Sequence, residues 1–410
     1  MRSWPSTYLP PALVETRHPS LSLRDSYSGE LVEVLDNPVS MYVCGITPYD
    51  ATHLGHAATY LTFDLINRYL LASGKSVAFT ENITDIDDPL FQRAKRDGVD
   101  WRSLGTSQID LFATDMTELR VLPPQNYRGV IESINDVITS VAKLIETGKT
   151  YSLAQDIYLD FSKIQGALEE LPLEQAEAIR TFAERGGDPE RVGKRHPLDP
   201  LLWKSESHPD ISWHTAFGQG RPGWHIECVA IALNYLPEKK SSSISIQGGG
   251  SDLKFPHHYM TAVQARAATG KQFSHLYLHC GMIGLDGEKM SKSKGNLVFV
   301  SKLLQSGISP MAIRIALLWR HYRADTMWSD SILEAASALI ERLNLNLSRT
   351  EVAPTSNVIQ EIVDALAHDL DTVKVFEILK SWCSDTESGK IGGEAGELSR
   401  ALDLYLGIAL

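Results

Sequence analysis

Residues 41–56 read MYVCGITPYDATHLGH, and this stretch decides the fold. An apolar, strand-like run ends at Cys44 and a glycine-containing turn. From His53 to His56 a new segment opens, whose apolar residues recur at helical spacing to about residue 73. We predict a strand, a turn and a helix with Thr52 as its N-cap. The helix N-terminus carries two imidazoles, and its free backbone N–H groups and dipole favour a bound phosphate.

A second motif, residues 287–296 with the sequence GEKMSKSKGN, places lysines in a glycine-flanked loop after a strand-like run. Taken singly, the histidines read as surface or capping residues and the lysines as a solvated basic loop. As a pair in this order, the two motifs resemble the HIGH and KMSKS signatures of class I aminoacyl-tRNA synthetases. The resemblance implies that His53, His56, Lys289 and Lys292 lie on opposite sides of an ATP, neutralise its phosphates and form the catalytic set.

Composition is that of an ordinary globular protein of 410 residues, with 43% hydrophobic and 22% charged residues. No apolar run is long enough to span a membrane, and the first residues lack the apolar core of a signal peptide. Four widely spaced cysteines favour a reducing, cytoplasmic compartment over a disulfide framework. The net charge of −12 argues against a broad nucleic-acid-binding surface.

The order of elements predicts an α/β fold with a Rossmann-like parallel sheet. A strand, a helix and a second strand beginning near Val77 imply a parallel pair with a right-handed crossover, so ligands bind at the carboxyl ends of the strands. We expect an irregular N-terminal arm, a catalytic domain interrupted by a connective insertion, and a C-terminal helical domain. The expected bounds are 1–37 for the arm, 38–305 for the catalytic domain, about 121–204 for the insertion, and 306–410 for the helical domain.

Cys44, Cys228 and His257 are the candidate metal ligands. Their spacing alone favours buried structural thiols and a histidine at a helix start. The fold argument raises the odds of a metal site, because each residue lies at a strand end or helix start on the expected ligand side of the sheet. Two thiolates and one imidazole suit zinc and leave a fourth position open.

Further motifs resemble cysteinyl-tRNA synthetase over about residues 40–330: YVCG at 42–45, NITDIDD at 82–88, GWHIEC at 223–228, GGGSD at 248–252 and FPHH at 255–258. The resemblance implies a class I synthetase-type catalytic domain with one zinc per chain in the amino-acid pocket. It also implies that Trp224 and Thr84 frame the amino acid and that Asp252 and Ile283 lie on the adenosine side. The complete expected substrate- and adenylate-binding set is Cys44, Gly45, Ile46, Thr47, Thr59, Asn82, Ile83, Thr84, Trp224, Gly250, Ser251, Asp252 and Ile283.

Two departures separate this chain from the synthetases. They follow the paired histidines with Glu-Asn-Glu, whose second glutamate is a zinc ligand, whereas this chain has Tyr259-Met260-Thr261. From Asp330 onward, 14 Asp and Glu stand against 6 Lys and Arg, a tail that would repel phosphates. With these departures the chain resembles the cysteine ligases of mycothiol biosynthesis.

That resemblance implies L-cysteine, ATP with Mg²⁺, and glucosaminyl-inositol as substrates. Cysteine would be joined to the sugar amine through a cysteinyl adenylate, with release of AMP and pyrophosphate. We expect no nucleic-acid partner, no membrane association and a monomer. A shortened cysteinyl-tRNA synthetase and a non-catalytic sensor of cysteine or its adenylate are the alternatives.

Overall fold

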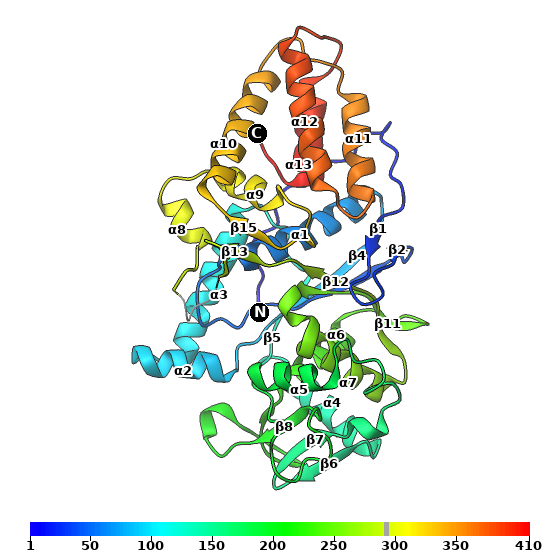
Figure 1. The fold of residues 1–410 in the computed structure, drawn as a ribbon, viewed down its shortest axis with the longest axis vertical. Helices are drawn as coiled ribbons and strands as arrows, with labels where there is room; N and C mark the ends of the chain where they lie inside the picture. Colours follow the sequence, from blue (N-terminus) through cyan, green and yellow to red (C-terminus); the bar gives the residue numbers. More distant parts are fainter. Residues whose placement is uncertain (291–294) are drawn as a thin grey trace.

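The computed structural model describes residues 1–290 and 295–410 and is built around a five-stranded parallel sheet (Figure 1). Each neighbouring pair of strands runs parallel, in the order β12-β11-β3-β4-β5. The strands are β3 (Val39–Val43), β4 (Val77–Ile83), β5 (Asn126–Gly129), β11 (Ser242–Gly250) and β12 (Gln272–Cys280). The predicted Rossmann-like parallel sheet is thereby confirmed.

Helices cover both faces of this sheet because residues of the central strand β3 alternate between two cores. Val39, Met41 and Val43 pack into one apolar cluster, while Tyr42 and Cys44 pack into the other. The first face carries α1 (Leu54–Ala72), and the opposite face carries α6 (Trp224–Tyr235) and α7 (Tyr259–Thr269) (Figure 1). The α1 start with His53 and His56 and the α6–α7 region with Cys228 and His257 therefore lie on opposite faces of the sheet, next to the carboxyl end of β3.

A second, five-stranded sheet lies beyond α6 and α7 (Figure 1). Its strands are β6 (Thr150–Leu153), β7 (Asp156–Leu159), β8 (Leu201–Ser205), β9 (Trp213–Thr215) and β10 (Gly218–Pro222), with α5 (Gln175–Glu184) inserted between β7 and β8. The expected bounds of the connective insertion, about 121–204, stay a prediction. β5 pairs with β4 in the main sheet, and the second sheet continues to Pro222.

Three helices and β5 lie between β4 and β6 in the sequence. The helices are α2 (Asp88–Asp97), α3 (Trp101–Glu118) and α4 (Ile134–Glu146). The sequence pattern did not predict α2. Asp87 accepts a hydrogen bond from the N–H of Asp88 at its start, and Gly98 ends it with a φ of 67°.

The C-terminal part of the chain is a helical bundle, at the top of Figure 1. A small sheet of β13 (Ile283–Leu285), β14 (Glu288–Lys289) and β15 (Thr326–Trp328) connects it to the main sheet. The helices are α8 (Val300–Gln305), α9 (Pro310–Leu318), α10 (Asp330–Leu347), α11 (Ser356–Ala367), α12 (Thr372–Glu387) and α13 (Ala395–Leu406). At the other end of the chain, β1 (Ser22–Arg24) pairs with β2 (Leu31–Glu33). Among the helices of the described ranges, none combines the length and apolar character needed to cross a membrane.

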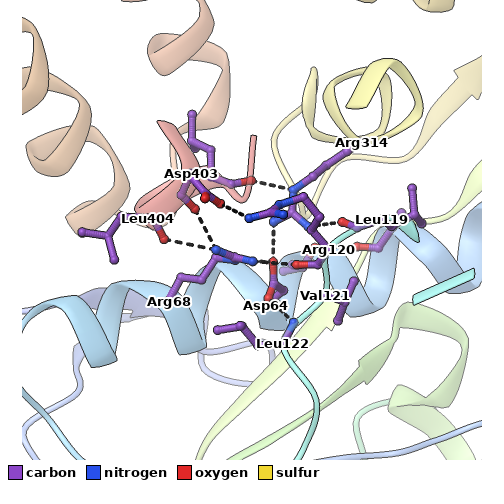
Figure 2. Close-up of polar contacts among 12 residues, drawn as sticks. Asp64, Arg68, Leu119, Arg120, Val121, Leu122, Arg314, Asp403 and Leu404 are labelled. Carbon is purple, nitrogen blue, oxygen red and sulfur yellow. Dashed lines mark hydrogen bonds and ion pairs between the residues drawn. The ribbon is translucent and has the colours of Figure 1, made fainter. Parts of the chain in front are cut away.

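A buried ionic junction joins α1 to the helical bundle (Figure 2). The Asp64 carboxylate accepts hydrogen bonds from Arg68 Nε at 2.8 Å and from Arg314, and all three side chains are fully buried. Arg68 also donates to the Asp403 carbonyl at 2.7 Å, and Arg314 donates to the Leu406 carbonyl at 2.5 Å. The carbonyl end of α13 therefore supplies part of the negative charge that two buried arginines need.

Candidate functional site

The structure brings Cys44, Cys228 and His257 together at the carboxyl end of β3. Their ligand atoms all lie within 4.8 Å of one another, and all three residues are buried. The two sulfurs are 3.9 Å apart, and His257 Nε2 lies 3.2 Å from Cys228 Sγ. The predicted convergence of these three residues is confirmed as a cluster that can hold a metal ion, and its donor set of two thiols and one imidazole fits zinc.

The turn after Cys44 is held by Asn82, at the end of the neighbouring strand β4. Its side-chain oxygen accepts hydrogen bonds from the Gly45 N–H at 3.0 Å and from the Tyr42 hydroxyl at 2.9 Å. A Cβ at position 45 would lie 1.6 Å from the Asn82 carbonyl oxygen. Only glycine allows this approach of the two strand ends, which fixes the direction of the Cys44 thiol.

Thr261 stands where the sequence resemblance to cysteinyl-tRNA synthetases implies a carboxylate ligand, and its side chain is buried. Its hydroxyl donates to the His257 carbonyl oxygen at 2.8 Å, within the same helix. No other Cys, His, Asp or Glu of the described ranges joins the three-residue cluster. Among the described residues the cluster therefore offers three candidate ligands, and an open fourth position stays a prediction.

A cavity of about 470 Å³ extends from the cluster to the N-terminus of α1. Its size and mixture of polar and apolar walls suit a small-molecule ligand. The described residues that line it are Cys44, Gly45, Ile46, Thr47, Tyr49, His53, Gly55, His56, Thr59, Tyr60, Trp224, Gly250, Asp252, Leu253, Cys280, Gly281, Met282, Met290 and Leu297.

Most of the expected binding residues lie on this cavity, and five lie elsewhere. Asn82, Ile83, Thr84, Ser251 and Ile283 do not line it. Asn82 and Thr84 hydrogen-bond to each other at 3.2 Å in the buried layer behind the Gly45 turn. Ile283 is part of the apolar core. Direct contact of these five residues with a substrate stays a prediction.

The N-terminus of α1 differs from the expectation in one respect. His53, not Thr52, is the N-cap, and its Nδ1 accepts hydrogen bonds from the N–H groups of Gly55 at 3.1 Å and His56 at 3.4 Å. The Leu54 N–H donates to the Val298 carbonyl. The prediction of free backbone N–H groups at this end is therefore wrong, because loop and cap atoms already accept from them.

At this helix end the polar groups that face the cavity include the imidazoles of His53 and His56. The rings of His53 and His56 stack with centroids 3.7 Å apart, and both line the cavity. Because Nδ1 of His53 is an acceptor, the proton of its neutral ring resides on Nε2. The imidazole rings, rather than free backbone amides, are what this helix end presents to the cavity.

The lysine motif is described only in part. The backbone of Lys289 belongs to β14, where it pairs with Gly284 of β13, and the neighbouring Met290 lines the cavity. This places the start of the motif beside the cavity, across from α1. Lys292 lies outside the described residues.

The two thiols have opposite acid–base character. Burial raises the pKa of the Cys44 thiol well above its usual value. Burial also acts on Cys228, but hydrogen bonding with Cys44 and the nearby His257 outweigh it and hold the pKa of Cys228 well below the usual value. Of the two thiols, Cys228 therefore loses its proton more readily.

The structure adds a set of buried histidines that the sequence analysis did not identify. His258 Nε2 lies 3.1 Å from Cys44 Sγ, and His279 Nε2 lies 2.8 Å from His258 Nδ1. On the other side, His225 Nδ1 lies 3.0 Å from His257 Nδ1. The GWHIEC and FPHH motifs contained two of the three, but their spacing does not reveal which histidine faces which thiol.

A parallel sheet with a cluster that can hold a metal ion and a histidine-bearing helix N-terminus beside one cavity is typical of a catalytic domain of the class I aminoacyl-tRNA synthetase type. The family model described as "tRNA synthetases class I (C) catalytic domain" matches residues 30–338. Among solved structures, Mycobacterium tuberculosis methionyl-tRNA synthetase in complex with methionyl-adenylate matches with a TM-score of 0.65 at 15% identity, over 90% of this chain and 89% of that one. A leucyl-tRNA synthetase complex, Agrobacterium radiobacter K84 agnB2 LeuRS-tRNA-LeuAMS, matches with a TM-score of 0.62 at 12% identity, over 92% and 84% of the two chains. At these identities the two structures show the fold alone.

Relatives that match over their full length identify one family within this class. A protein of Nakamurella multipartita named L-cysteine:1D-myo-inositol 2-amino-2-deoxy-alpha-D-glucopyranoside ligase is 50% identical, and one of Corynebacterium jeikeium named as ligase 2 of the same type is 49% identical, each over 100% of both chains. One of Streptomyces coelicolor with the same ligase name is 46% identical, also over 100% of both chains. The chain belongs to this ligase family, within the class I synthetase-type catalytic domains.

Proposed function

We infer that the protein joins L-cysteine to the amino group of glucosaminyl-inositol at the expense of ATP, with cysteinyl adenylate as the intermediate. The full-length identity of 46–50% to ligases named for this reaction carries the inference. The cavity agrees with it, because Cys44 of the three-residue cluster and the two histidines at the start of α1 line the same cavity. Mg²⁺ would accompany ATP.

Cys44, Cys228 and His257 are proposed to hold one zinc ion. The ion would supply a site for the thiolate of substrate cysteine at the open fourth position. Serine offers a harder and far less acidic hydroxyl, so it would bind poorly there. Trp224 stacks on His257 with ring centroids 4.1 Å apart and also lines the cavity, so it can confine the bound amino acid next to the cluster.

Adenylate formation requires stabilisation of charge on the phosphates. The cysteine carboxylate attacks the α-phosphorus of ATP, a bond to phosphorus forms, and pyrophosphate leaves. His53 and His56 at the start of α1 would donate hydrogen bonds to the phosphate oxygens, and the charges of Lys289 and Lys292 would neutralise them. The amine of the sugar then attacks the activated carbonyl, an amide forms, and AMP leaves.

Replacing Lys289 tests this assignment. Lys289→Ala is expected to slow cysteinyl-adenylate formation about 100-fold, because one charge-stabilising donor is removed. The measurement is single-turnover formation of the adenylate, with zinc content determined in parallel and expected to be unchanged. Lys302→Ala is the control, since Lys302 is exposed on α8. A wild-type rate in Lys289→Ala would leave the motif as a solvated basic loop.

The choice of acceptor tests the function itself. ATP–pyrophosphate exchange should depend on cysteine and not occur with serine. In transfer assays the purified protein should form the amide with glucosaminyl-inositol and leave tRNA uncharged, because the tail from Asp330 onward has 14 acidic against 6 basic residues and phosphate contacts dominate tRNA affinity. Efficient formation of cysteinyl-tRNA would instead establish a shortened cysteinyl-tRNA synthetase. Cysteine binding without exchange would establish a sensor.

A further inference from the structure

Two consecutive histidines each present the same ring nitrogen to a different thiol. His257 Nε2 lies 3.2 Å from Cys228 Sγ, and His258 Nε2 lies 3.1 Å from Cys44 Sγ. Both histidines and both cysteines are buried. Only His257 belongs to the set of ligand atoms that are mutually within 4.8 Å. His258 therefore faces a ligand without being placed as a ligand.

Each of these histidines has another buried histidine behind it. His225 Nδ1 is 3.0 Å from His257 Nδ1, and His279 Nε2 is 2.8 Å from His258 Nδ1. In each pair one nitrogen must donate and the other must accept. The protonation of His225 therefore decides which nitrogen of His257 carries the proton, and that of His279 decides it for His258.

The positions of the protons give His257 and His258 opposite tautomers. If His257 binds a metal through Nε2, its proton is on Nδ1 and is donated to His225. A metal-bound Cys44 has no proton, so His258 must donate to it from Nε2–H. The Nδ1 of His258 then accepts from the Nε2–H of His279, which leaves His279 Nδ1 without a proton. That last atom is buried and has no hydrogen-bond partner among the described residues, as an unprotonated nitrogen tolerates better than an N–H.

We propose that His258 is a positioning residue of the metal site: it donates a hydrogen bond from Nε2 to the Cys44 thiolate, in a tautomer that His279 fixes. The inference rests on the proposed metal site. The hydrogen bond orients Cys44 and draws charge from its sulfur, so that Cys44 and Cys228 become unequal ligands. The backbone is shaped for this contact, because a Cβ on Gly249 would lie 2.9 Å from the His258 ring.

The test compares variants by the properties of the metal site, independently of catalysis. His258→Phe keeps an aromatic ring and removes the donor, while His258→Gln can place an amide N–H near the position of Nε2. Zinc affinity is measured by competition with a chelator. The Co²⁺-loaded protein reports the sulfur ligands through its charge-transfer absorption. His275→Gln is the control, because His275 is exposed on the same strand as His279.

We expect His258→Phe to bind zinc about 10–100-fold more weakly, as loss of an outer partner of a metal ligand does, and to shift the charge-transfer band. His258→Gln should recover most of the affinity, and His279→Leu, which leaves His258 in place, should weaken binding in the same direction. Wild-type affinity and an unshifted band in both His258→Phe and His279→Leu would overturn the proposal. Loss of a nitrogen ligand from the Co²⁺ spectrum of His258→Phe would also overturn it, by making His258 a ligand. A wild-type protein that binds no zinc would instead refute the metal site proposed above.

Discussion

Cys228→Ala is expected to lose zinc almost completely. Cys228 is the thiol whose pKa is held well below its usual value, and its sulfur lies close to both Cys44 and His257. Two remaining ligands do not make a tetrahedral site. The loss of zinc affinity should exceed the roughly 10–100-fold that follows from losing an outer partner. Metal analysis of the purified protein measures it, and cysteine-dependent pyrophosphate exchange should fall with the zinc content.

Cys383→Ala is the matched control for this variant. Cys383 is also a buried free thiol, but it lies on α12 in the helical bundle and away from the cavity. Its replacement should leave zinc content and exchange unchanged. Undiminished zinc in Cys228→Ala would remove Cys228 from the site.

Asp64→Ala is expected to destabilise the protein by about 3–5 kcal/mol, because it leaves buried charge uncompensated. Burial alone would raise the pKa of Asp64, yet Arg68 and Arg314 hold it below its usual value. The carboxylate also accepts the Leu122 N–H at 2.8 Å. Urea unfolding followed by tryptophan fluorescence measures the shift in midpoint.

An exposed carboxylate with arginine partners provides the comparison. Asp97 accepts hydrogen bonds from Arg93 and from Arg96 on the surface of α2, where solvent screens the charges. Asp97→Asn should leave the unfolding midpoint almost unchanged. A midpoint for Asp64→Ala equal to that of the wild type would mean that the carbonyl groups around the arginines suffice without the carboxylate.

The sequence allowed the parallel sheet and the three-residue cluster to be predicted for a common reason. Cys44 directly follows an apolar strand, Cys228 lies near the start of α6 (Trp224–Tyr235), and His257 lies just before α7. Rules of parallel-sheet topology bring such positions to one edge. The prediction did not need side-chain conformations.

Other features depended on side-chain conformations and long-range packing. His53 is the N-cap in place of Thr52, because its ring Nδ1 accepts from the N–H of Gly55. Residue preferences for the N-cap position do not predict a histidine in this role. His279 meets His258 only because β12 is the edge strand beside β11. Asn82 was expected in the cavity but turned towards the Gly45 N–H, one layer behind it. The strand β15 has only 3 residues, too few to show a strand pattern in the sequence.

The junction at Asp64 also sets an order of events during synthesis. Arg68 is 335 residues ahead of Asp403, whose carbonyl it needs. At about 5–20 residues per second, the ribosome delivers the second after the first by on the order of tens of seconds. During that interval all five strands of the main sheet, which end at Cys280, can emerge, while Arg68 has Asp64 but not yet the carbonyl oxygen of Asp403. The nascent catalytic domain therefore forms the hydrogen bond from Arg68 to Asp403 only after α13 has been synthesised.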